Sequence, residues 1–411
     1  MADTTLVTSD TVAVVSDSTI TEFVNVARLT HTIDATQLNH SYISHRQHNN
    51  YYADTYLPFD SLDLTKHFSI DNRVALSLCE GFKRWAFADI TAFAEYKYDR
   101  YMLPDTLAGN PKEYDKFYHE NSLFIGGAIS SSHGKYLRYN VNGKTAIIGH
   151  ELGAFSIDGN VDFNFKLWKR DINISASAFI KNNKPSFYYR HFHSEHYWWD
   201  DNNLDKEFRT RIEGSFTLDK WRTRIKAGIE NIKNYTYFAN QSVPSGNGYL
   251  SRLTVAQESG NIQVLSATLN QDFKFGPLHL DTEFTYQNSS NKTVLPLPEL
   301  NLYANLYLKF KIAKVLNTEL GADVRYFTSY YAPDYSAALG QFVQQNQSDK
   351  IEIGDYPIVN IYANFLLKQT RFYVMYNHVN EGTGNMRSFL APHYPMSPRA
   401  LWFGLSWNFY N

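Results

Sequence analysis

The densest group of side chains that could do chemistry is the run from residue 191 to residue 201. His191, His193, Glu195 and His196 are possible metal ligands, and two Trp and two Asp residues follow closely. Imidazoles at positions i and i+2 share one face of a strand and can chelate Zn²⁺ or Cu²⁺, but neighbouring histidines on a polar rim are common without metal. We therefore favour a polar rim with an aromatic girdle over a specific metal site.

Ser194 lies between His193 and Glu195, which raises the possibility of a catalytic triad in an enzyme placed at a membrane rim. Neighbours in a strand point to opposite faces, so this run alone does not build a triad. The sequence contains no G-x-S-x-G, H-E-x-x-H or phosphate-binding loop, and its single cysteine, Cys79, excludes an intrachain disulfide. We expect no enzyme activity and no bound cofactor.

Apolar and polar residues alternate with period 2 along most of the chain, whereas the spacing typical of helices is scarce. The side chains discussed above are therefore expected to lie on or between β-strands. Leu302, Leu306 and Phe310 fall on one face of a predicted strand, and Tyr303 and Lys309 fall on the other. Runs of about 10 residues suit a tilted membrane strand better than the roughly 5 or 6 of soluble sheets. The sequence therefore predicts an all-β protein with one apolar and one polar sheet face.

The composition is compatible with a transmembrane barrel. Aromatic residues make up 16% of the chain, which suits two girdles at the membrane interfaces. The mean hydropathy is −0.42, and no run approaches the roughly 18 consecutive apolar residues of a membrane-spanning helix. Lys and Arg total 39 against 41 Asp and Glu, so the net charge does not predict binding to nucleic acid.

If the apolar face contacts lipid, the charged residues must face inward, because Arg or Lys on the lipid side at midplane costs roughly 2 to 4 kcal/mol. Fourteen residues are expected to line the interior: Arg209, Arg211, Glu213, Arg222, Arg224, Lys226, Glu230, Asp281, Glu283, Lys309, Lys311, Glu319, Asp323 and Arg325. Both signs of charge recur, so we expect little preference between ions. A solvated face of a soluble sheet explains each strand alone, but not so many long strands in series.

Four tyrosines fall on the same polar face, namely Tyr303, Tyr307, Tyr362 and Tyr373. A sugar-specific channel needs an aromatic track along its path, and these side chains could supply one. They could equally fill space in a narrow barrel. The sequence leaves both interpretations open.

Short and long connections alternate, as expected when one barrel end carries tight turns and the other carries extended loops. The expected turns are 168–171, 219–220, 276–277, 313–315 and 368–369, and the expected long connections include 37–66, 184–204, 240–261, 328–357 and 380–398. Between them we count about 16 strands, within a range of 14 to 18, which predicts a transmembrane antiparallel up-and-down β-barrel. We expect residues 1–18 to be disordered and 19–411 to form a single domain.

Tight turns also determine which residues face each other across a hairpin. A two-residue turn at 219–220, a three-residue turn at 313–315 and a two-residue turn at 276–277 each imply a register. The predicted pairs are Glu213 with Lys226, Arg209 with Glu230, Lys309 with Glu319, and Asp272 with Asp281. The last pair is repulsive, so lumen water or a bound cation would have to screen it.

The C-terminal segment ends in an aromatic strand. Residues 393–399, His-Tyr-Pro-Met-Ser-Pro-Arg, precede the alternating row Leu401, Phe403, Leu405, Trp407 and Phe409. Together with segments 356–364 and 149–153, this end resembles the putative porins of Bacteroidetes, and the resemblance covers most of the chain. It implies an outer-membrane barrel of a Gram-negative bacterium, inserted by the barrel-assembly machinery, with the row 401–409 as the assembly signal. Members of the family carry a signal peptide and further N-terminal residues, so we expect the natural chain to begin earlier.

We therefore expect an outer-membrane porin that lets small hydrophilic solutes diffuse passively through a polar lumen of mixed charge. Its expected partners are outer-membrane lipids and lipopolysaccharide, the barrel-assembly machinery during insertion, and the solutes themselves, with no nucleic acid. A structural or partner-binding barrel with a plugged lumen is the alternative, and an enzyme at the rim is a weaker one. The sequence determines neither the solute nor the oligomeric state.

Overall fold

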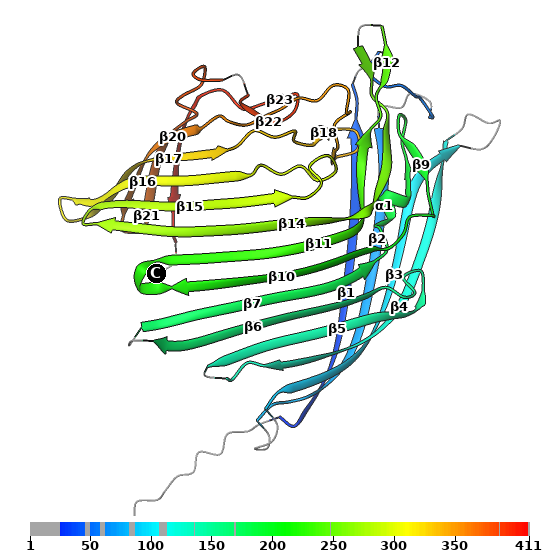
Figure 1. Cartoon of the computed structure of the whole chain (residues 1–411), viewed down its shortest axis with the longest axis horizontal. Coiled ribbons are helices and arrows are strands. Elements are labelled where there is room, and N and C mark those ends of the chain that lie inside the picture. Colours follow the sequence, from blue (N-terminus) through cyan, green and yellow to red (C-terminus); the bar gives the residue numbers. More distant parts are fainter. Residues whose placement is uncertain are drawn as a thin grey trace, which may run out of the picture.

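The structure is a computed structural model that describes residues 25–45, 50–57, 62–81, 87–106, 113–134, 136–167, 170–246, 248–385 and 387–409. The segment 1–18, expected to be disordered, lies outside these residues. Most of the described residues form β-strands, as the alternation predicts (Figure 1). No helix within the described ranges is long and apolar enough to cross a membrane.

Within the described residues, one large antiparallel sheet contains sixteen strands, and each strand pairs with the next strand of the sheet along the chain, which confirms the expected number. The strands are β1 (Ala27–Ile43), β2 (Leu62–Leu78), β3 (Asp89–Thr106), β4 (Glu113–Ser131), β5 (Leu137–Gly149), β6 (Phe155–Leu167), β7 (Arg170–Asn183), β10 (Glu207–Leu218), β11 (Thr223–Asn240), β14 (Leu253–Phe275), β15 (Leu278–Ser289), β16 (Leu300–Ile312), β17 (Leu316–Phe327), β20 (Ile358–Leu367), β21 (Thr370–Asn377) and β24 (Ala400–Trp407). Several are much longer than the roughly 10 residues needed to cross a membrane, so they extend past it.

In the parts of the long connections that the structure describes, there are four small hairpins. They are β8 (His191–His193) with β9 (Trp198–Asp200), β12 (Val243–Ser245) with β13 (Gly248–Leu250), β18 (Asp334–Ser336) with β19 (Gln341–Val343), and β22 (Phe389–Ala391) with β23 (Tyr394–Pro395). A single helical turn, α1 (Phe187–Arg190), precedes β8, and a 3₁₀ turn, η1 (Asp219–Trp221), follows β10. The five long connections expected from the sequence all belong to one end of the sheet, and the turns 219–222, 276–277, 313–315 and 368–369 to the other, together with the ten-residue connection 79–88.

Two connections are shorter than expected, because the strands beside them continue beyond their apolar cores. β1 runs to Ile43 and β2 starts at Leu62, so the connection spans 44–61 and not 37–66. β14 starts at Leu253, which reduces the connection after β11 to 241–252. The turns at 276–277, 313–315 and 368–369 have their expected lengths, whereas residues 168–169 lie outside the described ranges.

The register divides the sheet into two faces, because residues directly paired across a ladder point the same way. On the apolar face, Leu302 pairs with Tyr326 and Leu308 with Leu320, and the same face continues across β20 and β21 to Phe403. Here the expected outward residues are found together: Leu302, Leu306, Phe310, Leu320, Val324, Phe403, Leu405 and Trp407. Phe403, for example, is 79% exposed. Soluble monomers rarely expose a contiguous apolar surface that extends over several strands.

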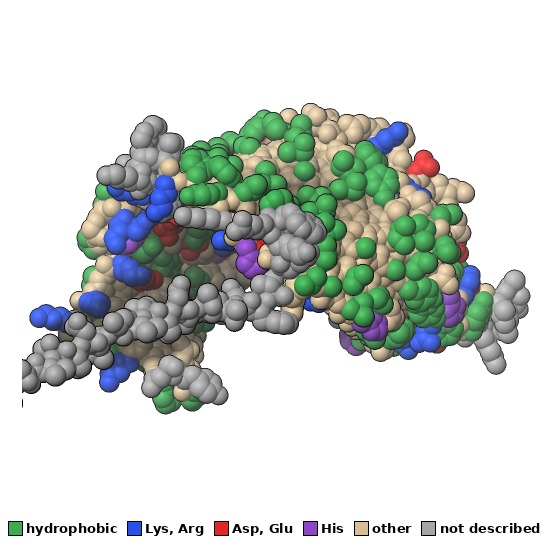
Figure 2. Space-filling view, turned by 90° about the horizontal axis from the view of Figure 1, so that it is seen from below, with side chains coloured by type: hydrophobic (Ala, Val, Ile, Leu, Met, Phe, Trp, Pro, Cys, Tyr) green, Lys and Arg blue, Asp and Glu red, His purple; other side chains and the backbone are tan. Residues whose placement is uncertain are grey.

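The sheet bends into an arch (Figure 1). In Figure 2, hydrophobic side chains are spread over the outer surface in view, while charged side chains are seen in the hollow. We call the hollow side the polar face. Among the described residues, β1 and β24 have no ladder with each other, so the expected closed ring is not formed by these residues alone.

The registers of two predicted hairpins are confirmed, and that of the third is wrong. Lys309 pairs with Glu319 and Asp272 pairs with Asp281, as the turn lengths require. Between β10 and β11, however, Glu213 lies opposite Gly228, two residues away from the predicted partner Lys226. Likewise, Arg209 lies opposite Ile232 instead of Glu230. The cause is a four-residue connection in place of two residues, and the even shift leaves every side chain on its predicted face.

Candidate pore lining and loop cap

Thirteen of the fourteen residues expected to line an interior lie together on the polar face. They are Arg209, Arg211 and Glu213 on β10, Arg224, Lys226 and Glu230 on β11, Asp281 and Glu283 on β15, Lys309 and Lys311 on β16, and Glu319, Asp323 and Arg325 on β17. The exception is Arg222, which ends η1 in a left-handed conformation with φ 53° and so lies in a turn at the sheet edge. Its backbone carbonyl oxygen accepts from the Asp272 N–H at 3.2 Å, and its place in the wall stays a prediction.

Opposite charges on the polar face contact each other along and across strands. Lys226 Nζ lies 2.7 Å from Glu213 Oε1, so the predicted pair meets diagonally despite the shifted register. Arg209 Nε likewise donates to Glu230 Oε1 at 2.8 Å. These side chains remain partly exposed, so each pair adds only about 0.2–1 kcal/mol to stability. Their main effect is to give the face both signs of charge at close range.

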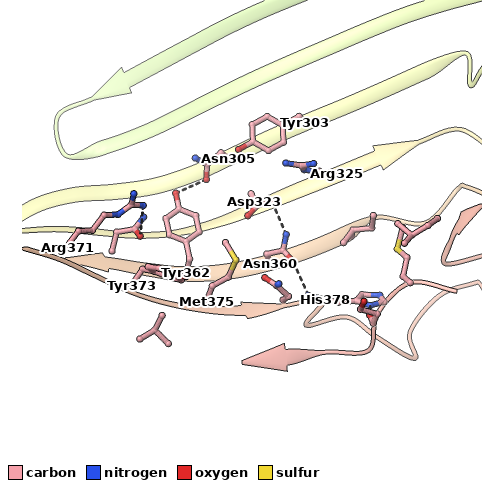
Figure 3. A pocket seen from close by; sticks show the side chains of 17 residues that line it. Tyr303, Asn305, Asp323, Arg325, Asn360, Tyr362, Arg371, Tyr373, Met375 and His378 are labelled. Atoms are coloured by element: carbon pink, nitrogen blue, oxygen red, sulfur yellow. Dashed lines mark hydrogen bonds between the residues drawn. The ribbon is translucent and has the colours of Figure 1, made fainter. Parts of the chain in front are cut away.

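A cavity of about 710 Å³ opens on the polar face of β16, β17, β20 and β21 (Figure 3). The Tyr362 hydroxyl donates to Asn305 Oδ1 at 2.9 Å, which links β20 to β16 across β17. Asn360 Nδ2 donates to Asp323 Oδ1 at 3.0 Å. The connection 378–399 supplies part of the rim through residues such as Met396. The cavity is thus lined by a mixture of amides, aromatic rings and charges of both signs.

The connection between β7 and β10 folds over the polar face instead of extending away from it. We call its segment 185–201, which contains α1, β8 and β9, the loop cap. The Phe187 ring stacks on Tyr101 of β3 with ring centroids 3.8 Å apart, and it meets Tyr118 of β4 edge-on. Tyr101 and Tyr118 are paired across the β3–β4 ladder on the polar face. The loop cap therefore covers part of the interior.

A buried ion pair attaches the loop cap to β4. Arg190 is only 1% exposed, and its Nη1 and Nη2 donate to Glu120 Oε1 and Oε2 at 2.8 and 3.0 Å. Its Nε donates to the Pro185 carbonyl oxygen at 3.0 Å. Three N–H groups of the guanidinium are therefore bonded, two of them to the carboxylate that balances its charge, as a buried charge requires.

The histidines of the predicted metal-ligand run are bonded to a carboxylate. His191 Nδ1 and His193 Nε2 lie 2.6 and 3.0 Å from the two oxygens of Asp200. Burial raises the pKa of the Asp200 carboxyl, but the hydrogen bonds from both histidines outweigh this effect and hold the pKa below its usual value. Across the described ranges, no group of three or more His, Cys, Asp or Glu is arranged to hold a metal ion.

Ser194 is part of the same loop and is buried. Its Oγ donates to the Tyr197 carbonyl oxygen at 3.2 Å and accepts from the Tyr197 backbone N–H at 3.1 Å. Both contacts close a local turn. The hydroxyl therefore stabilises the loop cap, and the triad geometry that its sequence neighbours raised as a possibility is not present here.

An apolar cluster joins the loop cap to a second long connection. The loop cap contributes three aromatic side chains, the ends of β11 and β14 contribute two residues, and the connection 328–357 contributes three. The members are Phe192, Tyr197, Trp199, Phe238, Leu253, Ala338, Leu339 and Val343. Two loops far apart in sequence are therefore held together at the long-connection end of the sheet.

The expected assembly row lies on the apolar face of the last strand. β24 pairs with β21 only, within the described residues, and Leu401, Phe403, Leu405 and Trp407 all point to the apolar side. Phe409 follows the strand and stacks on Trp407 with ring centroids 5.1 Å apart. This edge is thus an exposed aromatic strip.

Sequence reasoning missed the residues that hold the loop cap. Glu120 lies mid-strand on the polar face, and neither its partner Arg190 nor the role of Asp200 follows from local spacing. The one usable signal is an arginine within the otherwise aromatic run 187–190, because a charge in such surroundings requires a partner.

Sixteen antiparallel strands paired in chain order, with an exposed apolar face and a polar face, define the architecture of an outer-membrane β-barrel protein. The chain belongs to the family described as "Putative porin", whose model matches residues 12–411. Its place is the outer membrane of Gram-negative bacteria. No curated protein matches the chain.

Solved structures with a similar fold include receptors and a transporter. A variant ferric enterobactin receptor from Pseudomonas aeruginosa, in complex with enterobactin, matches with a TM-score of 0.62 and 12% identity, over 93% of this chain and 60% of that chain. The siderophore receptor PirA from Acinetobacter baumannii matches with a TM-score of 0.60 and 11% identity, over 93% and 60%. The copper transporter OprC gives 0.58 and 10%, over 92% and 62%. The chain thus spans about three fifths of the length of these proteins, and the similarity concerns the fold.

Proposed function

We propose that this protein is a porin through which small hydrophilic solutes diffuse passively across the outer membrane. The observation that carries the proposal is the separation of the two faces, which is clearest on β10 and β11 and on the strands from β16 to β24. Thirteen of the fourteen charged residues expected in the interior share the polar face, while Leu401, Phe403, Leu405 and Trp407 of the last strand share the other. Such a sheet is stable only with lipid on one side and water on the other.

The proposal includes a closed ring in the membrane and a single barrel domain over residues 19–411. An open edge would leave the unpaired N–H and C=O groups of β1 and β24 in hydrocarbon, at a cost of several kcal/mol for each group. The charged residues of the polar face then line the lumen, and lipids with lipopolysaccharide surround the apolar face. The row 401–409 would present the assembly signal to the barrel-assembly machinery.

A barrel with a plugged lumen that binds a partner is the second candidate. It is favoured by the loop cap, which covers the polar face of β3 and β4 and is fastened by Arg190 and the apolar cluster. The fold it shares with receptor barrels is compatible with either candidate. The two differ in whether the cap leaves a continuous water path.

Single-channel recording of the purified full chain in planar bilayers, together with liposome swelling in sugars, amino acids and peptides, tests the proposal. A porin gives steady open currents and swelling that decreases with solute size. A silent wild type, with currents restored by deleting residues 187–200, would identify a plugged barrel instead. Swelling no faster than in protein-free liposomes for both proteins would contradict passive diffusion.

A further inference from the structure

Two tyrosines of the polar face lie opposite glycines. Tyr362 of β20 pairs with Gly321 of β17, and Tyr373 of β21 pairs with Gly404 of β24. A Cβ added at Gly321 would meet Cζ of Tyr362 at 2.7 Å, and a Cβ at Gly404 would collide with the Tyr373 ring. Each ring therefore lies down across the neighbouring strand, in the space that a side chain would occupy. A ring in this position packs one π face on the wall and turns the other toward the interior.

The tyrosines form a ladder along the axis of the strands. Of the rows that hold a tyrosine, that of Tyr303 is nearest the long connections. Tyr362 shares the row of Tyr307 and Gly321, and Tyr373 lies one row further, at the level of Lys309. Tyr303 and Lys309 are six residues apart on β16, which corresponds to about 20 Å at the rise of a β-strand. The ladder is therefore long enough for more than one ring of a chain-like solute.

Hydrogen-bonding groups flank the rings at every level. Asn305, Asp323 and Asn360 occupy the row between Tyr303 and Tyr362 (Figure 3). Asn364 shares the row of Tyr373. Asn360 and Asp323 already bond each other, and Tyr362 bonds Asn305, so their positions are set before a solute arrives. A pre-positioned set of amides and carboxylates beside flat rings is suited to a ligand with apolar C–H faces and hydroxyl edges.

The open cavity argues against rings that merely fill space. Tyr373 is 37% exposed, although one of its faces rests on β24. About 710 Å³ of open volume lies in front of the ladder, bordered by β16, β17, β20, β21 and the connection 378–399. A purely apolar solute would leave the amides without partners, and an ion of either sign would meet its own charge at Asp323 or Arg325.

We infer that the tyrosine ladder of β16, β20 and β21 is a binding track for a neutral saccharide, whose ring faces stack on the tyrosines while its hydroxyls bond the flanking amides and Asp323. The inference rests on the proposed porin function and names the solute class that this wall would select. Gly321 and Gly404 act as positioning residues because they hold the rings flat.

The test uses maltohexaose as the probe and the full chain in planar bilayers. Saccharide binding is measured as a concentration-dependent block of the ion current, and a polyethylene glycol of similar size controls for blocking by bulk alone. The double variant Tyr362→Ala with Tyr373→Ala should bind about tenfold more weakly and still conduct ions. Phe179→Ala provides a matched control, because this aromatic residue lies on the polar face of β7, far across the sheet.

A second variant separates ring position from ring chemistry. Gly321→Val keeps all the tyrosines but inserts a side chain where the Tyr362 ring lies, so it should weaken the saccharide block while ion conductance persists. Tyr362→Phe, which retains the ring, should keep most of the binding. A loss confined to the aromatic and glycine variants supports the track.

The inference and the proposed function fail in different ways. Open channels that maltohexaose and polyethylene glycol block equally, or an unchanged block in the double alanine variant, would overturn the saccharide track and leave the porin intact. A silent channel whose purified protein still binds maltohexaose in calorimetry, with Tyr362→Ala and Tyr373→Ala weakening it, would support the track and overturn passive diffusion. Silence without binding overturns both.

Discussion

Replacing Arg190 by Ala should release the loop cap from the polar face. The guanidinium is 1% exposed and makes two charge-assisted hydrogen bonds to Glu120 and a third to the Pro185 carbonyl oxygen. Removal leaves the Glu120 carboxylate, whose side chain is 13% exposed, without its main cation. The loss of one partner from a buried ion pair costs about 3–5 kcal/mol.

His150 is the nearest alternative partner, with its Nε2 3.2 Å from Glu120 Oε1. Burial lowers the pKa of His150, and the nearby charges of Arg190 and Lys184 lower it further, although Glu120 raises it. In R190A the lowering by Arg190 is absent, but burial and Lys184 still lower the pKa of His150, so the imidazole replaces only part of the missing guanidinium charge. Even 3 kcal/mol corresponds to a rise of roughly 150-fold in the population with the cap released.

Limited proteolysis measures this population, because cleavage of a transiently opened segment follows the equilibrium fraction that is open. Chymotrypsin should cut R190A within the aromatic run 187–189 on the order of 100-fold faster than the parent protein. Arg252→Ala is the matched control, since Arg252 also contacts both carboxylate oxygens of Asp54 but at an exposed position, and its cleavage rate should stay near that of the parent. Single-channel conductance should rise in R190A alone.

The reasoning is wrong if folded R190A is cleaved within twofold of the parent rate. The heat-modifiable migration of the barrel distinguishes misfolding from cap release, because release of the cap leaves this migration unchanged. The double variant Arg190→Met with Glu120→Leu offers a further check. It removes both charges and therefore should restore part of the protection, because no uncompensated carboxylate remains.

Three further predictions concern other parts of the molecule. The hydrogen bonds from the two histidines lower the pKa of Asp200 by more than burial raises it, so this carboxylate should stabilise the cap above about pH 4 and less as the pH falls. Proteolysis of the cap should therefore become faster in acid, and this pH dependence should be weaker in Asp200→Asn. Lys309→Glu should shift reversal potentials toward cation selectivity while thermal stability changes by less than about 1 kcal/mol, because the Lys309–Glu319 pair is exposed. Deleting Trp407–Asn411 should block outer-membrane insertion; a heat-modifiable barrel in the outer-membrane fraction would refute this.

The β-sheet architecture could be predicted from the sequence because its signals are local. Alternation with period 2 places each side chain on a face whatever the strand pairs with, so the apolar row of Leu302, Leu306 and Phe310 was correct. A short turn also determines the register when its length follows from the apolar rows on either side, as the pairing of Lys309 with Glu319 shows. The turn after β10 was predicted at the right place but two residues too short, because it also includes Arg222 in a left-handed conformation that no glycine marks.

The functional features depended on contacts between distant segments. Arg190 and Glu120 are seventy residues apart, and only the inward fold of the connection after β7 brings them together. The histidine run contains potential metal ligands, yet the β8–β9 hairpin places Asp200 between His191 and His193. The sequence by itself determined which residues face lipid or water, since that follows from spacing along one strand. The tertiary structure alone decided that Tyr362 lies on Gly321 and that a loop covers the interior, because both require the alignment of strands and loops that share no local pattern.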